Sequence, residues 1–203
     1  IESFPWCVDL KKFNDHIDGA PLRAELGYAQ DDFVVLCNRR HEEVCGVEYL
    51  TRAIPRVLNR LPKAKFLILG EGSETSKLRR IVGQMGADSH VRFEGSVSNS
   101  MMPQYLSAAD VYISPSLSDG TSASLLEAMA CQKPVIVTDL PANREWIVDG
   151  RSGLLVPARD PSAIADAIVM IGSSPHVAKA YAKEALEVVR RRANVRDSLA
   201  RYE

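Results

Sequence analysis

The feature that most limits the fold of this 203-residue chain is a series of short, wholly apolar segments, each followed by residues with helical spacing. We expect the apolar segments to be buried strands at residues 33–37, 65–69, 90–94, 111–114, 134–138 and 154–156. We expect the intervening helices at residues 47–59, 74–85, 102–108, 125–130 and 143–148, with two final helices at 161–171 and 176–192. Strands that are apolar throughout and alternate with helices form parallel sheets covered on both faces. The sequence therefore predicts one doubly wound α/β domain with a six-stranded parallel sheet.

Composition excludes several classes of protein. The formal net charge is -1, so no overall field favours nucleic acid or anionic lipid. The four cysteines lack the short spacings of a zinc site, which indicates reduced thiols and a cytoplasmic location. No apolar run reaches the roughly 18 residues of a spanning helix. The first residue is Ile, so we expect the chain to be a piece of a longer protein.

The predicted sheet indicates where a ligand would bind. In the commonest doubly wound order, 3-2-1-4-5-6, the winding reverses between the first and fourth strands, and ligands bind beyond their carboxyl ends. The segments at those ends are residues 38–43 and 114–122, which carry the densest polar chemistry of the chain. We therefore expect one site formed by these two loops.

The residue types in these loops suit a ligand with a phosphate centre and hydroxylated rings. Arg40 offers a planar set of donors for phosphate oxygens. Gly120, Thr121 and Ser122 introduce a helix whose free N–H groups favour an anion. Asp119 and Glu127 would repel an anion, so we expect them to accept hydrogen bonds from hydroxyls. A sugar nucleotide meets both demands.

Motifs along the whole chain then resemble a known family. They are Val8-Asp9-Leu10 with Phe13, Arg40 six residues before Gly46, Leu69-Gly70-Glu71-Gly72, Val91-Arg92-Phe93-Glu94-Gly95 and Ala108-Ala109-Asp110-Val111. The most specific run is Pro115-Ser116, Asp119-Gly120, Leu126-Glu127-Ala128-Met129-Ala130 and Pro134-Val135, followed by Asp149-Gly150 and Gly153-Leu154-Leu155-Val156-Pro157. This pattern is similar to the C-terminal, donor-binding domain of retaining GT-B glycosyltransferases of group 1.

The resemblance implies a fold and a set of roles. Residues 1–203 would form one Rossmann-like nucleotide-sugar-binding domain, the C-terminal half of a GT-B fold, and a separate N-terminal domain would hold the acceptor. The domain would bind a nucleoside diphosphate sugar for hexosyl transfer with retention, and this piece alone would be inactive. The implied catalytic residues are Arg40, which would neutralise the diphosphate, and Asp119, which would bind the transferred sugar. The implied donor-binding residues are Arg39, Gly72, Gly120, Thr121, Ser122 and Glu127, with Glu127 on the ribose hydroxyls.

No side chain makes a convincing nucleophile, so we expect catalysis by preorganised charge around the departing diphosphate. No acidic metal cluster is evident, and we expect neither a metal nor another cofactor. The full-length protein would be cytoplasmic, with peripheral contact at the inner membrane face, and would make cell-surface polysaccharide or glycoconjugate. It would not bind nucleic acid.

The chain departs from the family pattern at two positions of the expected site. Asp119 stands where the family usually has Glu, and Cys45 stands where it usually has Lys before the glycine that matches Gly46. The diphosphate would then be met by Arg40, with Arg39 as the candidate for a second cation.

Plainer interpretations of single residues remain open at this point. Ser124-x-x-Glu127 also matches a capping box, in which Glu127 only caps its helix. Asp119 could be ordinary turn chemistry, and Arg39 and Arg40 could be solvated surface charges. His41 is more typical of a surface or strand-end residue than of a catalytic group.

Two other functions remain open for the chain as a whole. A sugar-nucleotide epimerase would share the diphosphate site, and a non-catalytic sugar-nucleotide or carbohydrate-binding module would use the same loops. The base, the sugar, the acceptor and the linkage are not specified by these residues.

Overall fold

Six parallel strands form the centre of the molecule in a computed structural model that describes residues 7–193. The strands are β1 (Phe33–Cys37), β2 (Ala64–Leu69), β3 (Val91–Gly95), β4 (Val111–Ser114), β5 (Val135–Thr138) and β6 (Leu154–Val156). Their order is β3-β2-β1-β4-β5-β6, and every neighbouring pair is parallel. This is the common 3-2-1-4-5-6 order that was assumed in locating the site, and the predicted doubly wound α/β fold is confirmed.

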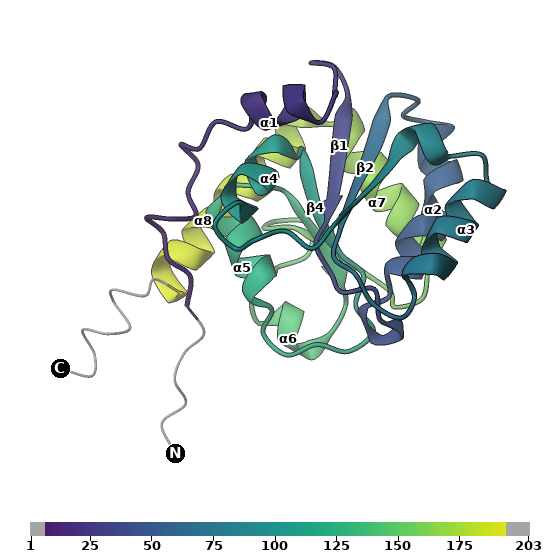
Figure 1. Cartoon of the computed structure of the whole chain (residues 1–203). Helices are drawn as coiled ribbons and strands as arrows, with labels where there is room; N and C mark the ends of the chain where they lie inside the picture. Colours follow the sequence, from purple (N-terminus) through teal and green to yellow (C-terminus); the bar gives the residue numbers. More distant parts are fainter. Residues whose placement is uncertain (1–6, 194–203) are drawn as a thin grey trace.

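Helices cover both faces of this sheet (Figure 1). They are α1 (Ala20–Glu25), α2 (Val47–Leu58), α3 (Thr75–Gln84), α4 (Met102–Ala108), α5 (Ala123–Ala130), α6 (Pro141–Arg144), α7 (Pro161–Ser173) and α8 (Pro175–Arg192), with short 3-10 turns at Glu43–Cys45 and Asp88–His90. Figure 1 shows α2 and α3 on one side of the strands and α4, α5 and α8 on the other.

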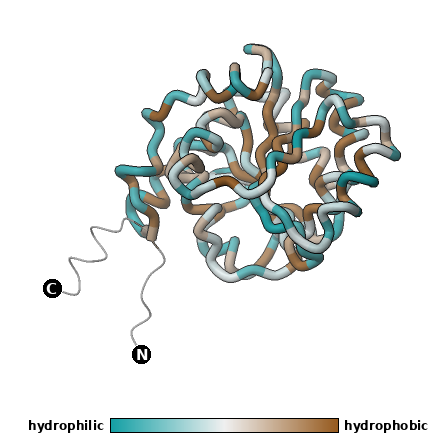
Figure 2. Tube along the Cα trace, viewed as in Figure 1, coloured by the Kyte–Doolittle hydropathy of each residue, from teal (hydrophilic) through white to brown (hydrophobic). Residues whose placement is uncertain are grey.

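Alternating side chains along each strand build two separate cores. In β1, Val34 and Leu36 pack with residues of α4, α5 and α8, whereas Val35 and Cys37 pack with residues of α2, α3 and α7. Successive side chains of a strand point to opposite faces, so only a strand that is apolar at every position can supply both cores. Figure 2 shows the resulting concentration of hydrophobic residues along the central strands.

Two helices differ from the sequence prediction. The helix expected at residues 143–148 is observed at Pro141–Arg144. Proline is favoured in the first turn of a helix, and the buried Trp146 and Ile147 follow the helix instead of belonging to it. Helix α1 was not predicted, because its six residues are too few for a periodic signal and only Leu22 is buried.

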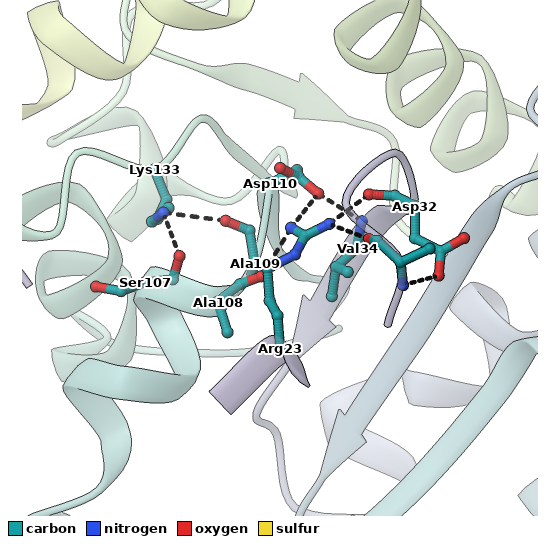
Figure 3. A network of polar contacts seen from close by, with 9 residues as sticks. Arg23, Asp32, Val34, Ser107, Ala108, Ala109, Asp110 and Lys133 are labelled. Atoms are coloured by element: carbon teal, nitrogen blue, oxygen red, sulfur yellow. Dashed lines mark hydrogen bonds and ion pairs between the residues drawn. The ribbon is translucent and has the colours of Figure 1, made fainter. Parts of the chain in front are cut away.

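A polar network joins the amino ends of β1 and β4 (Figure 3). The Asp110 carboxylate accepts a hydrogen bond from the Val34 amide at 2.7 Å and pairs with the Arg23 guanidinium at 2.9 Å. Lys133 donates to the carbonyl groups of Ser107 and Ala109, both at 3.0 Å, where α4 ends. The Ala-Ala-Asp-Val motif therefore has a structural role at the edge of the sheet opposite the loops that were expected to bind a ligand.

Candidate functional site

The β1–α2 and β4–α5 loops meet at the carboxyl edge of the sheet. The Leu117 amide donates to the Val44 carbonyl at 2.8 Å. Gly46 has φ +63°, and a Cβ atom there would lie 2.1 Å from the Pro115 carbonyl oxygen. Glycine tolerates this backbone conformation and has no side chain to obstruct the approach. The space between these loops is called the crevice below.

Arg39 links the two sides of the crevice. Its Nη2 atom lies 2.7 Å from the Asp119 Oδ2 atom, and its Nη1 atom donates to the Ser122 hydroxyl at 3.0 Å. The Arg39 and Asp119 side chains are only 16% and 20% exposed. The interpretation of Arg39 as a solvated charge is therefore wrong, and Asp119 has an ion-pair partner in addition to its place in the turn.

Arg40 has a different environment. Its side chain is 79% exposed, and its Nη2 atom lies 3.6 Å from the Glu42 carboxylate. Arg40 thus remains outside the Arg39–Asp119 ion pair, and its description as a solvated surface charge fits the structure. Its predicted contact with a diphosphate stays a prediction.

The start of α5 does not form a capping box. The helix begins at Ala123 with Ser122 as its N-cap, so Ser124 is the second helical residue instead of the cap that the box requires. The Ser122 side chain makes no capping hydrogen bond, and its hydroxyl accepts from Arg39. The capping-box interpretation of Glu127 is therefore wrong.

The rest of the β4–α5 loop leaves open space before the helix. Gly120 is exposed, and no heavy atom lies within 4 Å of the position that its Cβ would take. The Thr121 hydroxyl accepts from the Trp146 indole N–H at 3.4 Å. The loop is held at Asp119, Thr121 and Ser122 but has no side chain at Gly120, so a ligand could approach its backbone there.

Glu127 is half-buried, and burial raises the pKa of its carboxyl group. The Asn99 amide and the Lys12 ammonium oppose this rise in pKa. Lys12 also donates to the Asn99 side-chain oxygen. The sequence reasoning missed both residues: Asn99 follows β3 in a polar loop, and Lys12 lies inside the Val8–Phe13 motif, whose recognisable positions are its apolar residues and Asp9.

Gly72 packs tightly against the loop that follows β1. A Cβ atom on Gly72 would lie 2.5 Å from the His41 carbonyl oxygen. The Gly72 amide donates to the Thr75 hydroxyl at 3.0 Å, and that hydroxyl lies 2.9 Å from Nδ1 of His41. His41 is 1% exposed, so its interpretation as a surface residue is wrong, whereas its position after the end of β1 agrees with the other interpretation; burial lowers the pKa of its imidazole. The predicted contact between Gly72 and a ligand stays a prediction.

Cys45 cannot supply the positive charge of the lysine that the family pattern places at this position. Its side chain is 8% exposed and packs in the core formed with α2, α3 and α7.

Cys7, Cys37, Cys45 and Cys131 are all free thiols. Within residues 7–193 no three His, Cys, Asp or Glu side chains gather as a metal site would require, and no helix is long and apolar enough to span a membrane.

Comparison with known proteins identifies the class of fold and then the family. The chain superposes on half of a sucrose-phosphate synthase from Thermosynechococcus elongatus with a TM-score of 0.86 and 29% identity, over 98% of this chain and 50% of the other. It superposes on Anabaena HepE in complex with UDP-glucose with a TM-score of 0.88 and 22% identity, over 96% of this chain and 54% of the other. The fold is thus one half of a GT-B glycosyltransferase.

Sequence comparison agrees with this fold. The family model for group 1 glycosyl transferases matches residues 31–173. A phosphatidyl-myo-inositol mannosyltransferase of Mycobacterium leprae is 35% identical over 179 residues, which cover 87% of this chain and 46% of the relative. The chain belongs to the group 1 glycosyltransferase family and spans about half the length of the curated relatives it matches.

Proposed function

We propose that the chain is the donor-binding half of a retaining hexosyltransferase that uses a nucleoside diphosphate sugar. The observation that carries the proposal is the convergence of the β1–α2 and β4–α5 loops in a group 1 glycosyltransferase domain. These loops place a guanidinium group, a carboxylate and the start of α5 in one crevice. Such a set can bind both an anion and hydroxyl groups.

In this proposal each part of the donor has its own ligands. The Glu127 carboxylate accepts hydrogen bonds from the ribose hydroxyls, and Asp119 accepts from the transferred sugar. The amides of Gly120, Thr121 and Ser122 bind the sugar or the phosphates at the start of α5. Arg40, on the exposed rim, closes over the diphosphate and, with the α5 dipole, stabilises its charge as the glycosidic bond breaks. These groups perform the work that a metal ion would otherwise do.

The names of similar proteins support this donor class. The Anabaena structure is a complex with UDP-glucose, and the mycobacterial relative is named a mannosyltransferase. We propose that a second domain holds the acceptor, since the chain covers about half of these proteins. We also propose that the whole protein works in the cytoplasm, where thiols stay reduced, with peripheral contact at the inner membrane face.

The experiment is a calorimetric titration of the chain with UDP, GDP, ADP and their hexose conjugates. Saturable binding of at least one, in the micromolar to millimolar range, is expected of a polar half-site. Arg40→Ala should weaken the binding of the nucleoside diphosphate but barely change the binding of the free nucleoside. Glu127→Gln should weaken the binding of both ligands, because both contain ribose. Absence of binding to every nucleotide would remove the proposal. Product analysis with the full-length protein then separates a glycoside from an epimerised donor.

A further inference from the structure

Two adjacent arginines at the end of β1 have opposite environments. Arg39 is 16% exposed and pairs with Asp119, while Arg40 is 79% exposed and pairs only loosely with Glu42. One arginine is thus turned into the crevice and the other is turned to solvent. Arg39 is therefore the arginine whose position is fixed by the fold.

The guanidinium of Arg39 divides its donors between two residues of one loop. Nη2 pairs with Oδ2 of Asp119, and Nη1 donates to the hydroxyl of Ser122, the N-cap of α5. A planar guanidinium can hold two acceptors in fixed directions, which an ammonium group cannot do. Arg39 thus sets the position of Asp119 relative to the N-cap residue of α5.

Asp119 has no other ion-pair partner within residues 7–193, and a Cβ atom on its neighbour Gly120 would meet no atom of the rest of the chain within 4 Å. The ion pair with Arg39 therefore holds this carboxylate beside an exposed glycine. A carboxylate has about four lone-pair sites on its two oxygens, so Asp119 can accept a hydrogen bond from a ligand hydroxyl while it pairs with Arg39.

We infer that Arg39 is a positioning residue: it fixes the Asp119 carboxylate for recognition of the sugar half of the donor and does not bind the nucleotide. The inference rests on the proposed function and refines it. In this inference the crevice has a sugar-binding part, formed by Asp119 with Arg39 as its support, and a nucleotide-binding part that contains Glu127 and Arg40.

The test measures how much the sugar contributes to binding. Two pairs of ligands are titrated into the chain: UDP with UDP-glucose, and GDP with GDP-mannose. For the pair that binds more tightly, the dissociation constant of the sugar conjugate is divided by that of the diphosphate, and this ratio is compared between variants. Asp119→Asn should shift this ratio against the sugar conjugate by roughly tenfold, as expected for one charge-assisted hydrogen bond. Arg39→Gln should shift it by a similar factor and leave the affinity for the diphosphate nearly unchanged. The double variant should be no worse than either single variant.

Further variants separate positioning from a general effect on the fold. Arg39→Lys restores a charge beside Asp119 and should recover part of the ratio. Arg56→Lys is the matched control, because Arg56 forms an exposed ion pair with Asp166 between α2 and α7. It should leave both ligands at wild-type affinity. All titrations are made well below the melting temperature of the least stable variant.

The failures are distinguishable. Three results would overturn the inference. Arg39→Gln could reduce the affinities for the diphosphate and for its sugar conjugate by the same factor, or the changes in the ratio could add in the double variant. The ratio could also be no better in Arg39→Lys than in Arg39→Gln. If Asp119→Asn left the ratio unchanged, the inference would also be overturned, although the proposal that the chain binds a nucleotide would stand. Failure of the wild-type chain to bind any nucleotide would instead remove the proposed function beneath it.

Discussion

Gly46 and Pro115 hold the two loops of the crevice in backbone contact: a Cβ atom on Gly46 would lie 2.1 Å from the carbonyl oxygen of Pro115. Gly46 also has φ +63° and is the N-cap of α2, so one residue sets both the start of a helix and the separation of the loops. The geometry of Arg39, Asp119 and Ser122 depends on this contact, because Arg39 and Gly46 belong to one loop and Asp119 and Ser122 to the other.

Gly46→Ala should destabilise the chain and weaken nucleotide binding. The left-handed backbone and the clash with Pro115 together should cost about 2–5 kcal/mol of unfolding free energy, measured by urea denaturation. Gly86→Ala is the control, since Gly86 has φ +65° but no neighbour within 4 Å of its Cβ position. Only the backbone strain, about 1 kcal/mol, is expected there. Equal losses in both variants would show that the contact with Pro115 is unimportant.

Glu127→Gln should stabilise the ligand-free chain near neutral pH while weakening nucleotide binding. Burial raises the pKa of Glu127 above its ordinary value of 4.5, so the folded state retains the proton to higher pH than the unfolded state. The carboxyl group therefore contributes stability below pH 4.5 and loses it as pH rises through the folded pKa. The amide that replaces it does not titrate, so the melting temperature of the variant should exceed that of the wild type at pH 7, and this advantage should disappear at acid pH.

Nucleotide affinity of the same variant should fall by roughly 10- to 100-fold, because a neutral amide loses charge-assisted hydrogen bonds to ribose. A well-folded Glu127→Gln chain with wild-type affinity would contradict the ribose role.

His41 should make the chain acid-sensitive. Burial and, to a smaller extent, the nearby charge of Arg79 lower the pKa of His41 below 6.5, while a hydrogen bond with the Leu69 backbone and the charge of Glu71 act in the opposite direction. The unfolded state therefore binds the proton first, and stability is lost as pH falls below 6.5 toward the folded pKa. The melting temperature should drop between pH 7 and pH 5.5, and His41→Asn should flatten this drop.

Asp110→Ala should lower the unfolding free energy by about 1–3 kcal/mol, because it leaves the Val34 amide and the Arg23 guanidinium without their carboxylate. Chemical denaturation measures the loss. Asp166→Ala, which removes only an exposed ion pair with Arg56, should cost about 0–1 kcal/mol. The difference between the two variants reports what the network of Figure 3 contributes.

Binding of the preferred nucleoside diphosphate should survive EDTA. Arginine and the start of α5 replace a bridging cation in the proposed site, so the dissociation constant should be unchanged by chelation. A loss of affinity that added magnesium or manganese restores would show that the charge balance of the crevice has been misinterpreted.

The sequence by itself determined the strands of the sheet and, once the commonest winding order is assumed, the edge at which polar loops meet. Runs such as Phe33–Cys37 are short and apolar at every position, and that pattern is typical of a strand buried on both faces. Once six such strands alternate with helices, the usual winding rules place the segments after β1 and β4 side by side.

Only the tertiary structure decided which side chains face the crevice. Arg39 and Arg40 have the same chemistry and adjacent positions, and the direction of each is set by local backbone geometry and by acceptors far away in the sequence, Asp119 and Ser122 for Arg39. Lys12 and Asn99 reach Glu127 for the same reason: contacts between distant loops carry no periodic signal in the sequence. Hydrophobic periodicity reports burial along an element, whereas the direction of a polar side chain in a loop depends on partners that only folding brings near.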